Sequence, residues 1–184
     1  MRAVLDANVF YSTWVTDPLL CMADAELYEP VWSRRIMGEV REHLPSVWRR
    51  ATREGVDRYL RTLSMAFPEA TVGDWEPLEG MVSGLPDPDD RHVVAVAIRS
   101  GAHVVVTSNL KDFPDGCLGR FGLRAVSPDG FLSMLFDDDP DAAASAMRGL
   151  VKSKRHPPRT MEEEIGRLRG LGLVRFAGRL ASMG

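Results

Sequence analysis

Four acidic side chains occupy positions that solubility alone does not explain. Asp6 directly follows the first apolar run of the chain, and Asp112 follows a valine-rich run at 103–107. Asp90 begins a largely apolar helical stretch, and Glu39 lies on or near the buried face of a predicted helix. Converging carboxylates repel one another, and one must take up a proton unless a cation compensates the charge. Mg²⁺ or Mn²⁺, which prefer hard oxygen ligands, would compensate it.

Each of these acids also has a structural explanation. Asp6 could only cap the turn that follows it, and Asp112 could be an ordinary loop acid. Asp90 could complement the dipole of its helix, for which two further acids are available nearby. Glu39 could be a solvated helix residue. Because no single acid decides between the two explanations, the hypothesis of a metal site depends on the set of four.

Other kinds of catalytic site find little support in the sequence. It contains no Gly-x-Gly-x-x-Gly and no Walker-type loop, and neither Ser46 nor Ser133 lies in a nucleophile elbow. The four histidines have no i,i+4 pair for zinc, and His92 is expected on a helix surface. Cys21 and Cys117 are too few for a disulfide framework. We therefore expect reduced thiols in a cytoplasmic protein.

Short apolar runs that alternate with helical patterns predict the elements that position the acids. Strands are expected at 3–5, 28–32, 67–72, 103–107 and 123–126. Helices are expected at 17–26, at 33–43, from Pro45 to about 63, at 75–82 and at 87–100. This alternation predicts an α/β protein, a three-layer α/β/α sandwich with a central, mainly parallel sheet. Asp6 and Asp112 would lie at the carboxyl edge of that sheet, where such proteins bind ligands.

Several residue types indicate where the helices begin and end. Pro18 suits the first position of its helix, and Ser33 is a good N-cap for the next one. Asp87 is placed to cap the helix that contains Asp90, and Gly101 is placed to end it. Beyond residue 140, further helices are expected at 141–152, 160–171 and 173–180, the second of them starting with a capping box at Thr160.

Charge is distributed unevenly along the 184 residues, although the net charge is only −3. Residues 1–140 hold 14 Lys and Arg against 22 Asp and Glu, whereas residues 141–184 hold 9 against 4. The chain is therefore predicted to form a domain at 1–136 and a basic helical extension at 141–184. No apolar run approaches the roughly 18 residues of a membrane span, and an acid at position 6 comes too early for a signal peptide.

Four motifs together resemble the PIN domain, and more narrowly the VapC-type toxin ribonucleases of toxin–antitoxin systems. The resemblance covers about residues 1–136. The motifs are Val4-Leu5-Asp6-Ala7-Asn8-Val9, Glu39 after Ser33, Asp87-Pro88-Asp89-Asp90-Arg91-His92, and Thr107-Ser108-Asn109-Leu110-Lys111-Asp112-Phe113. The spaced set is specific, whereas any one motif is weak. It implies an Mg²⁺- or Mn²⁺-dependent endoribonuclease that leaves a 5′-phosphate and a 3′-hydroxyl.

The resemblance also implies roles for individual residues. The catalytic and metal-binding acids would be Asp6, Glu39, Asp90 and Asp112. Asp90 matches the third acid better than Asp89, which remains a supporting candidate. Thr107 and Asn109 match polar residues that support Asp112, and Ser12 falls where such domains often carry a hydroxyl. The implied partners are RNA, a cognate antitoxin and a second copy of the chain, and no membrane is expected.

An acidic metal site needs basic residues to gather its polyanionic substrate. The candidates are Arg49, Arg50, Arg53, Lys111, Lys152, Lys154 and Arg155. The three arginines could equally form a solvated helix face, and the last three residues a flexible basic linker or a partner-binding tail. Two alternatives to a ribonuclease stay open from the residues, namely a non-catalytic PIN-like scaffold that binds RNA or protein, and a nuclease that cuts DNA.

Overall fold

The computed structural model describes residues 1–48, 51–155 and 157–183. The chain divides into two compact units. The sheet unit comprises Met1–Tyr11 and Glu29–Val126, and the helical unit comprises Ser12–Tyr28 together with the chain from Ser127 onward. The predicted division into domains at 136–141 stays a prediction. Within the described part of the chain, no helix combines the length and the apolar character that crossing a bilayer would require.

Among the described residues, the sheet unit has four parallel strands in the order β2-β1-β3-β4. The strands are β1 (Arg2–Leu5), β2 (Glu29–Val31), β3 (Val104–Val106) and β4 (Arg124–Val126). Leu5 pairs with Val106, and these are the last residues of the two central strands, β1 and β3. Because both strands run the same way, the residues that follow them meet at one edge of the sheet. The predicted α/β class with a parallel sheet is thus confirmed.

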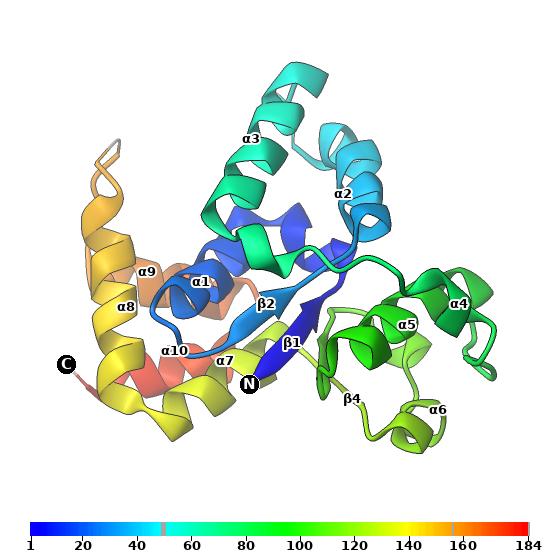
Figure 1. Cartoon of the computed structure of the whole chain (residues 1–184). Helices are drawn as coiled ribbons and strands as arrows, with labels where there is room; N and C mark the ends of the chain where they lie inside the picture. Colours follow the sequence, from blue (N-terminus) through cyan, green and yellow to red (C-terminus); the bar gives the residue numbers. More distant parts are fainter. Residues whose placement is uncertain (49–50, 156, 184) are drawn as a thin grey trace. The chain divides into compact units, whose positions relative to one another are not determined.

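Helices and single turns connect these strands and bury their faces (Figure 1). The helices are α2 (Arg34–Val47), α3 (Arg53–Ala66), α4 (Glu76–Glu79), α5 (Arg91–Ser100) and α6 (Asp115–Leu118). The 3₁₀ turns are η1 (Ala7–Tyr11), η2 (Pro68–Ala70), η3 (Pro88–Asp90), η4 (Leu110–Asp112) and η5 (Gly119–Phe121). Helix α5 packs against β1 and β3, and its residues 93–97 are fully buried. Its apolar sequence therefore belongs to the core.

In the part of the chain that the structure describes, the helical unit consists of one early helix and four late ones. They are α1 (Thr13–Asp24), α7 (Pro128–Asp138), α8 (Pro140–Ser153), α9 (Met161–Gly170) and α10 (Val174–Ala181). Helix α1 packs against α7, α8 and α9, and the Tyr28 ring meets Phe131 edge-on at 4.9 Å. Phe131, Leu168 and Phe176 are fully buried, so this unit has an apolar core of its own.

Most predicted helix ends are confirmed by hydrogen bonds. The Ser33 hydroxyl accepts a bond from the Ile36 N–H (3.2 Å), and Thr160 and Glu163 form the expected capping box. Asp87 caps the turn η3, which leads directly into α5. Gly101 ends α5 with a φ of +68°, a conformation that favours glycine.

The structure corrects two expectations about proline. Pro18 lies inside α1 instead of at its first position, because α1 already begins at Thr13 and packing of its apolar face outweighs the local penalty. Pro45 does not start a new helix, because α2 continues through it to Val47 and α3 begins only at Arg53. A proline removes the bond to the carbonyl four residues earlier, here on the exposed Arg41, which water can reach.

The strand expected at 67–72 is also wrong. Residues 68–70 form the turn η2, and only Thr71 bridges to the sheet, through Trp32. Pro68 has no N–H to donate to a strand partner, which disfavours a longer ladder there.

Candidate active site

Asp6 is the most buried of the four candidate acids, with 6% of its surface exposed. It follows β1 directly, and three donors hold its carboxylate. The Ala7 N–H donates to Oδ1 (2.7 Å), and the Asn8 amide (2.5 Å) and the Thr107 hydroxyl (2.7 Å) donate to Oδ2. The carboxylate is therefore fixed in one orientation at the carboxyl edge of the sheet.

Thr107 links the two central strands at this edge. It follows β3 and is fully buried, and its hydroxyl accepts bonds from the Asn8 amide (2.8 Å) and the Asn109 N–H (3.0 Å). The Asn8 side-chain carbonyl in turn accepts from the Ser108 N–H (2.9 Å). The Thr107 side chain thus bonds to Asp6, not to Asp112, and ties the loop after β3 to the loop after β1.

Asp112 lies in the turn η4, three residues after Asn109. The Asn109 amide donates a hydrogen bond to the Asp112 carboxylate. Because the Asn109 N–H is bonded to Thr107, the orientation of Asp112 is linked to that of Asp6 through two side chains.

Glu39 projects from α2 and is held by residues of two helices. Its Oε1 lies 2.9 Å from Nε2 of His92 and 3.8 Å from Nε of Arg35. His92 is 1% exposed, so the expectation that it lies on a helix surface is wrong. Its ring faces Trp75 at 6.0 Å, and its Nδ1 has no hydrogen-bond partner among the described residues. His92 therefore acts as a buried support for Glu39.

Asp90 is half-buried at the start of α5, next to the exposed Asp89. Burial raises the pKa of Asp90 to about 6, with further contributions from the charges of Asp6, Asp87 and Asp112 and an opposing one from His92. The side chain of Asp90 thus lies within electrostatic reach of two other candidate acids. The backbone of Asp89, by contrast, is engaged locally, with its N–H bonded to Asp87 Oδ1 (2.9 Å) and its carbonyl to Arg35 (3.4 Å).

The four acids share one electrostatic environment. Burial raises the pKa of Asp6, against the hydrogen bonds that lower it, and the charge of Glu39 raises it further. Burial also raises the pKa of Tyr11 to about 12, again with contributions from Asp6 and Glu39. In the described part of the chain, no lysine or arginine forms an ion pair with Asp6, Asp90 or Asp112. Among the described residues, only the opposing contribution of His92, and no lysine or arginine ion pair, offsets the repulsion among these three carboxylates.

A divalent cation fits this environment in donor type and in charge. Carboxylate oxygens are the ligands that Mg²⁺ and Mn²⁺ prefer, and a cation would offset the repulsion. The acids do not form a ready-made cage, because no three His, Cys, Asp or Glu side chains among the described residues are placed to hold one ion. The fit to a metal thus depends on ligand type and negative charge, and not on coordination geometry. The residues that provide both are Asp6, Glu39, Asp90 and Asp112.

The remaining predicted residues lie in several places. Ser12 belongs to the helical unit, where it precedes α1 without a side-chain capping bond. Arg49 and Arg50 fall outside the described residues. Arg53, Lys111, Lys152 and Arg155 are exposed. Lys154 forms an ion pair with Asp17 (2.5 Å), so its charge is engaged within the helical unit.

Three residues of this site were not among the predicted ones. Asn8 carried a usable signal, since an amide two residues after a strand-end acid lies within reach of it. His92 was misassigned because the residues that follow it at the start of α5 are all apolar, so the sequence does not indicate which face of the helix is buried. Arg35 had no signal, because its contacts with Glu79 (3.1 Å) and with the Asp89 carbonyl join segments distant in the sequence.

Comparison with known proteins gives the family. The family model of the PIN domain matches residues 2–111. This range contains Asp6, Glu39 and Asp90 and ends one residue before Asp112. The chain belongs to the PIN domain family. A second model, the VapC50 C-terminal domain, matches residues 128–182, so the late helices of this PIN protein are similar to that domain.

One curated relative of this PIN protein is named "Putative ribonuclease VapC50", from Mycobacterium tuberculosis (strain ATCC 25618 / H37Rv). The two are 42% identical over 71 residues, which are 39% of this chain and 42% of the relative. The match thus spans less than half the length of that relative. No solved structure matches this PIN protein.

Proposed function

We propose that this PIN protein is a metal-dependent endoribonuclease, the toxin of a type II toxin–antitoxin module acting in the cytoplasm. The observation that carries the proposal is the set of carboxylates around the rigidly held Asp6. Among the described residues, no lysine or arginine forms an ion pair with Asp6, Asp90 or Asp112, and Glu39 has only a distant one, with Arg35. Family membership supports nuclease chemistry, and the name of the M. tuberculosis relative supports RNA as the substrate.

Asp6, Glu39, Asp90 and Asp112 would hold one or two Mg²⁺ or Mn²⁺ ions, directly or through water. A bound ion would lower the pKa of a water towards neutrality and offset the charge that builds up on the phosphate. The residues around the acids orient them for this role. Thr107 and Asn8 hold Asp6, whereas His92 supports Glu39.

The substrate must reach this acidic edge as a polyanion. Exposed basic residues reduce its repulsion by neutralising phosphates. In the sheet unit, Arg53 and Lys111 are exposed, and Lys111 is the neighbour of Asp112 in η4. In the helical unit, Lys152 and Arg155 are exposed. We assign these four residues, each within its own unit, to RNA binding. A cognate antitoxin would have to cover the acidic edge of the sheet unit to inhibit cleavage.

The test is cleavage of a single-stranded RNA by the full chain with Mg²⁺ or Mn²⁺. We expect cleavage with either ion, none with EDTA, and a loss of about 100-fold or more in Asp6→Asn and Asp112→Asn, whose side chains keep the same size. Asp112→Asn is included because Asp6 is buried, so that its substitution carries the greater risk of preventing folding. The matched control is Asp115→Asn, which changes an exposed acid of α6.

Cleavage at the wild-type rate by Asp112→Asn or in EDTA would contradict the proposal. Calorimetric titration with Mn²⁺ separates the nuclease from a non-catalytic scaffold, because a scaffold has no need to bind the ion at these acids. A chain that neither binds Mn²⁺ nor cuts RNA would support the scaffold. If the chain cut DNA in preference to RNA, the proposed substrate would be wrong, but the assignment of the site residues would stand.

A further inference from the structure

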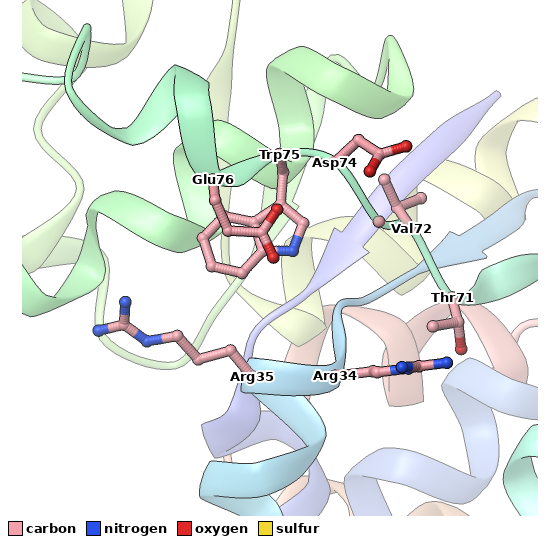
Figure 2. Close-up of a pocket in the computed structure, with 8 residues that line it drawn as sticks. Arg34, Arg35, Thr71, Val72, Asp74, Trp75 and Glu76 are labelled. Carbon is pink, nitrogen blue, oxygen red and sulfur yellow. The ribbon is translucent and has the colours of Figure 1, made fainter.

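A cavity of about 490 Å³ opens in the sheet unit between the start of α2 and residues 71–76 (Figure 2). Arg34 and Arg35 line it from α2, and Asp74, Trp75 and Glu76 line it from the opposite segment. We call it the Trp75 pocket. It is separate from the carboxylate set, since none of the four candidate acids lines it.

Two hydrogen-bond donors of the Trp75 pocket lack partners. Arg34 is exposed and makes neither an ion pair nor a side-chain hydrogen bond with the described residues. Trp75 is only 6% exposed, and its indole N–H has no acceptor in the described part of the chain. Figure 2 draws the indole nitrogen on the side of the ring nearer to Arg34 and Thr71. The indole nitrogen itself reaches solvent, so its N–H can donate to a bound ligand in place of water.

The pocket also presents acceptors. Glu76 forms no ion pair with the described residues, and Asp74 has only a distant one, with Arg99 at 3.9 Å. Asp74 adopts a φ of +55°, unusual for a residue with a side chain, and its side chain is 91% exposed. A free phosphate would be repelled by two carboxylates. A ligand with both donors and acceptors, in contrast, satisfies the arginine, the indole and the acids together.

An unpaired nucleobase has this combination of groups. Single-stranded RNA is read through hydrogen bonds to base edges and through stacking on arginine or aromatic planes. Guanine carries two adjacent N–H donors on its Watson–Crick edge, which match a carboxylate, and acceptors at O6 and N7, which match arginine or an indole N–H. Uracil has one N–H donor on this edge, so it can donate only one hydrogen bond to the carboxylate, whereas guanine can donate two.

The pocket also adjoins the carboxylate set through Arg35. This residue lines the pocket, and its guanidinium contacts Glu39 (3.8 Å) and the carbonyl of Asp89 (3.4 Å), the residue before Asp90. Arg35 thus joins the pocket to Glu39 directly, and to Asp90 only through the backbone of the preceding residue.

We propose that the Trp75 pocket binds one unpaired nucleotide of the RNA substrate and favours guanine. This inference rests on the proposed ribonuclease function for its ligand class. Glu76 accepts from the Watson–Crick edge of the base, the Trp75 N–H donates to it, and Arg34 neutralises a backbone phosphate. The pocket thereby selects the sequence that is presented to the carboxylates.

The experiment measures binding of two labelled oligoribonucleotides to the full chain in EDTA, so that metal-dependent cleavage plays no part. One is all uridine, and the other carries a single central guanosine. We expect the wild type to bind the guanosine strand about tenfold more tightly. Glu76→Gln should lose that preference, whereas Arg34→Gln should weaken both strands equally and lower the salt slope by about one.

The matched control is Arg58→Gln, which removes the same charge from an exposed position on α3 and should keep the guanine preference. Equal affinity of the wild type for the two strands would overturn the proposal, as would a guanine preference that survives in Glu76→Gln. The outcome is independent of the proposed nuclease. A chain that prefers guanosine but cuts nothing with Mg²⁺ refutes the nuclease alone, and one that cuts RNA without any preference refutes the pocket alone.

Discussion

Asp90 holds its proton more tightly than an ordinary aspartate does, because burial and the neighbouring acids raise its pKa from 3.8 to about 6. Between these two pH values the folded chain retains a proton that the unfolded chain has released. Lowering the pH through about 6 therefore stabilises the metal-free fold, as far as this group is concerned. The same proton must leave before a cation binds, so metal affinity should fall as the pH decreases through 6.

We accordingly predict opposite effects of Asp90→Asn on stability and on activity. In EDTA at pH 7 the neutral amide removes the repulsion, and Tm should rise by a few degrees. RNA cleavage with Mg²⁺ should fall by about 100-fold or more, because a metal-binding carboxylate is lost. Thermal unfolding followed by circular dichroism, together with a cleavage assay, measures both.

Asp89→Asn is the control for both measurements, because Asp89 is the neighbour of Asp90 in the chain and its side chain is exposed. It should leave the cleavage rate within about twofold of the wild type. If Asp90→Asn lowered Tm in EDTA, or if Asp89→Asn were the inactive variant, the assignment of the third acid would have to change.

At the scale of elements, the first turn of α2 connects two sites. It carries Arg34 and Arg35 of the Trp75 pocket, and Glu39 lies one turn further along. The fully buried Ser33 fixes where this helix begins, through its bond to the Ile36 N–H. Any change in the start of α2 should therefore affect binding and catalysis together.

We predict that Ser33→Ala destabilises the chain by about 1 kcal/mol, as loss of a helix cap generally does. Cleavage should fall by about tenfold, because Glu39 and Arg35 shift with the first turns of the helix. Chemical denaturation and the cleavage assay measure the two effects.

Thr160→Ala provides the comparison, because Thr160 caps α9 of the helical unit with the same kind of bond, from the Glu163 N–H (3.2 Å), and α9 carries none of the proposed RNA-binding residues. A similar loss of stability with unchanged cleavage is expected there. Equal activity losses in both variants would show that Ser33 acts only through overall stability.

Elements with local signals were predictable from the sequence, and contacts between distant segments were not. Ser33, Gly101 and Thr160 act on backbone within four residues of themselves, and all three were predicted correctly. Pro18 was misread because the packing that tolerates it involves other helices, and Pro45 because the sequence does not show that the carbonyl it leaves free is exposed to water. In the site, strand-end acids and their loops could be placed from chain order, whereas the pairing of His92 with Glu39 depends on how α2 meets α5.

At the scale of the whole molecule, the late basic segment is less free than its charge suggests. Among the described residues, four of its cations form ion pairs. They are Lys154 with Asp17, Arg159 with Glu164, Arg175 with Asp129 and Arg179 with Asp137. Arg159 and Arg167 also lie over the Trp14 ring, at 3.8 and 4.8 Å from its centroid. Much of this positive charge therefore holds the helical unit together.

Removing the chain after Asp139 should consequently destabilise the protein as well as remove charge. Helices α1 and α7 would lose α8, α9 and α10, against which their apolar faces pack. We predict a lower Tm and aggregation on heating, measured by circular dichroism and light scattering. The double variant Lys152→Gln, Arg155→Gln, which changes only exposed cations, should keep the wild-type Tm. A truncated chain with the wild-type Tm would contradict this account of the helical unit.

The bond between Thr107 and Asp6 joins residues 101 positions apart. A ribosome must therefore release more than half of the chain from its exit tunnel before the central strands can pair. Until then Asp6 lacks the hydroxyl that orients it, and Asp112 has not yet emerged. If the chain is the proposed ribonuclease, a nascent chain that has not yet exposed Asp112 lacks the assembled carboxylates and does not cut the message or the ribosome that makes it.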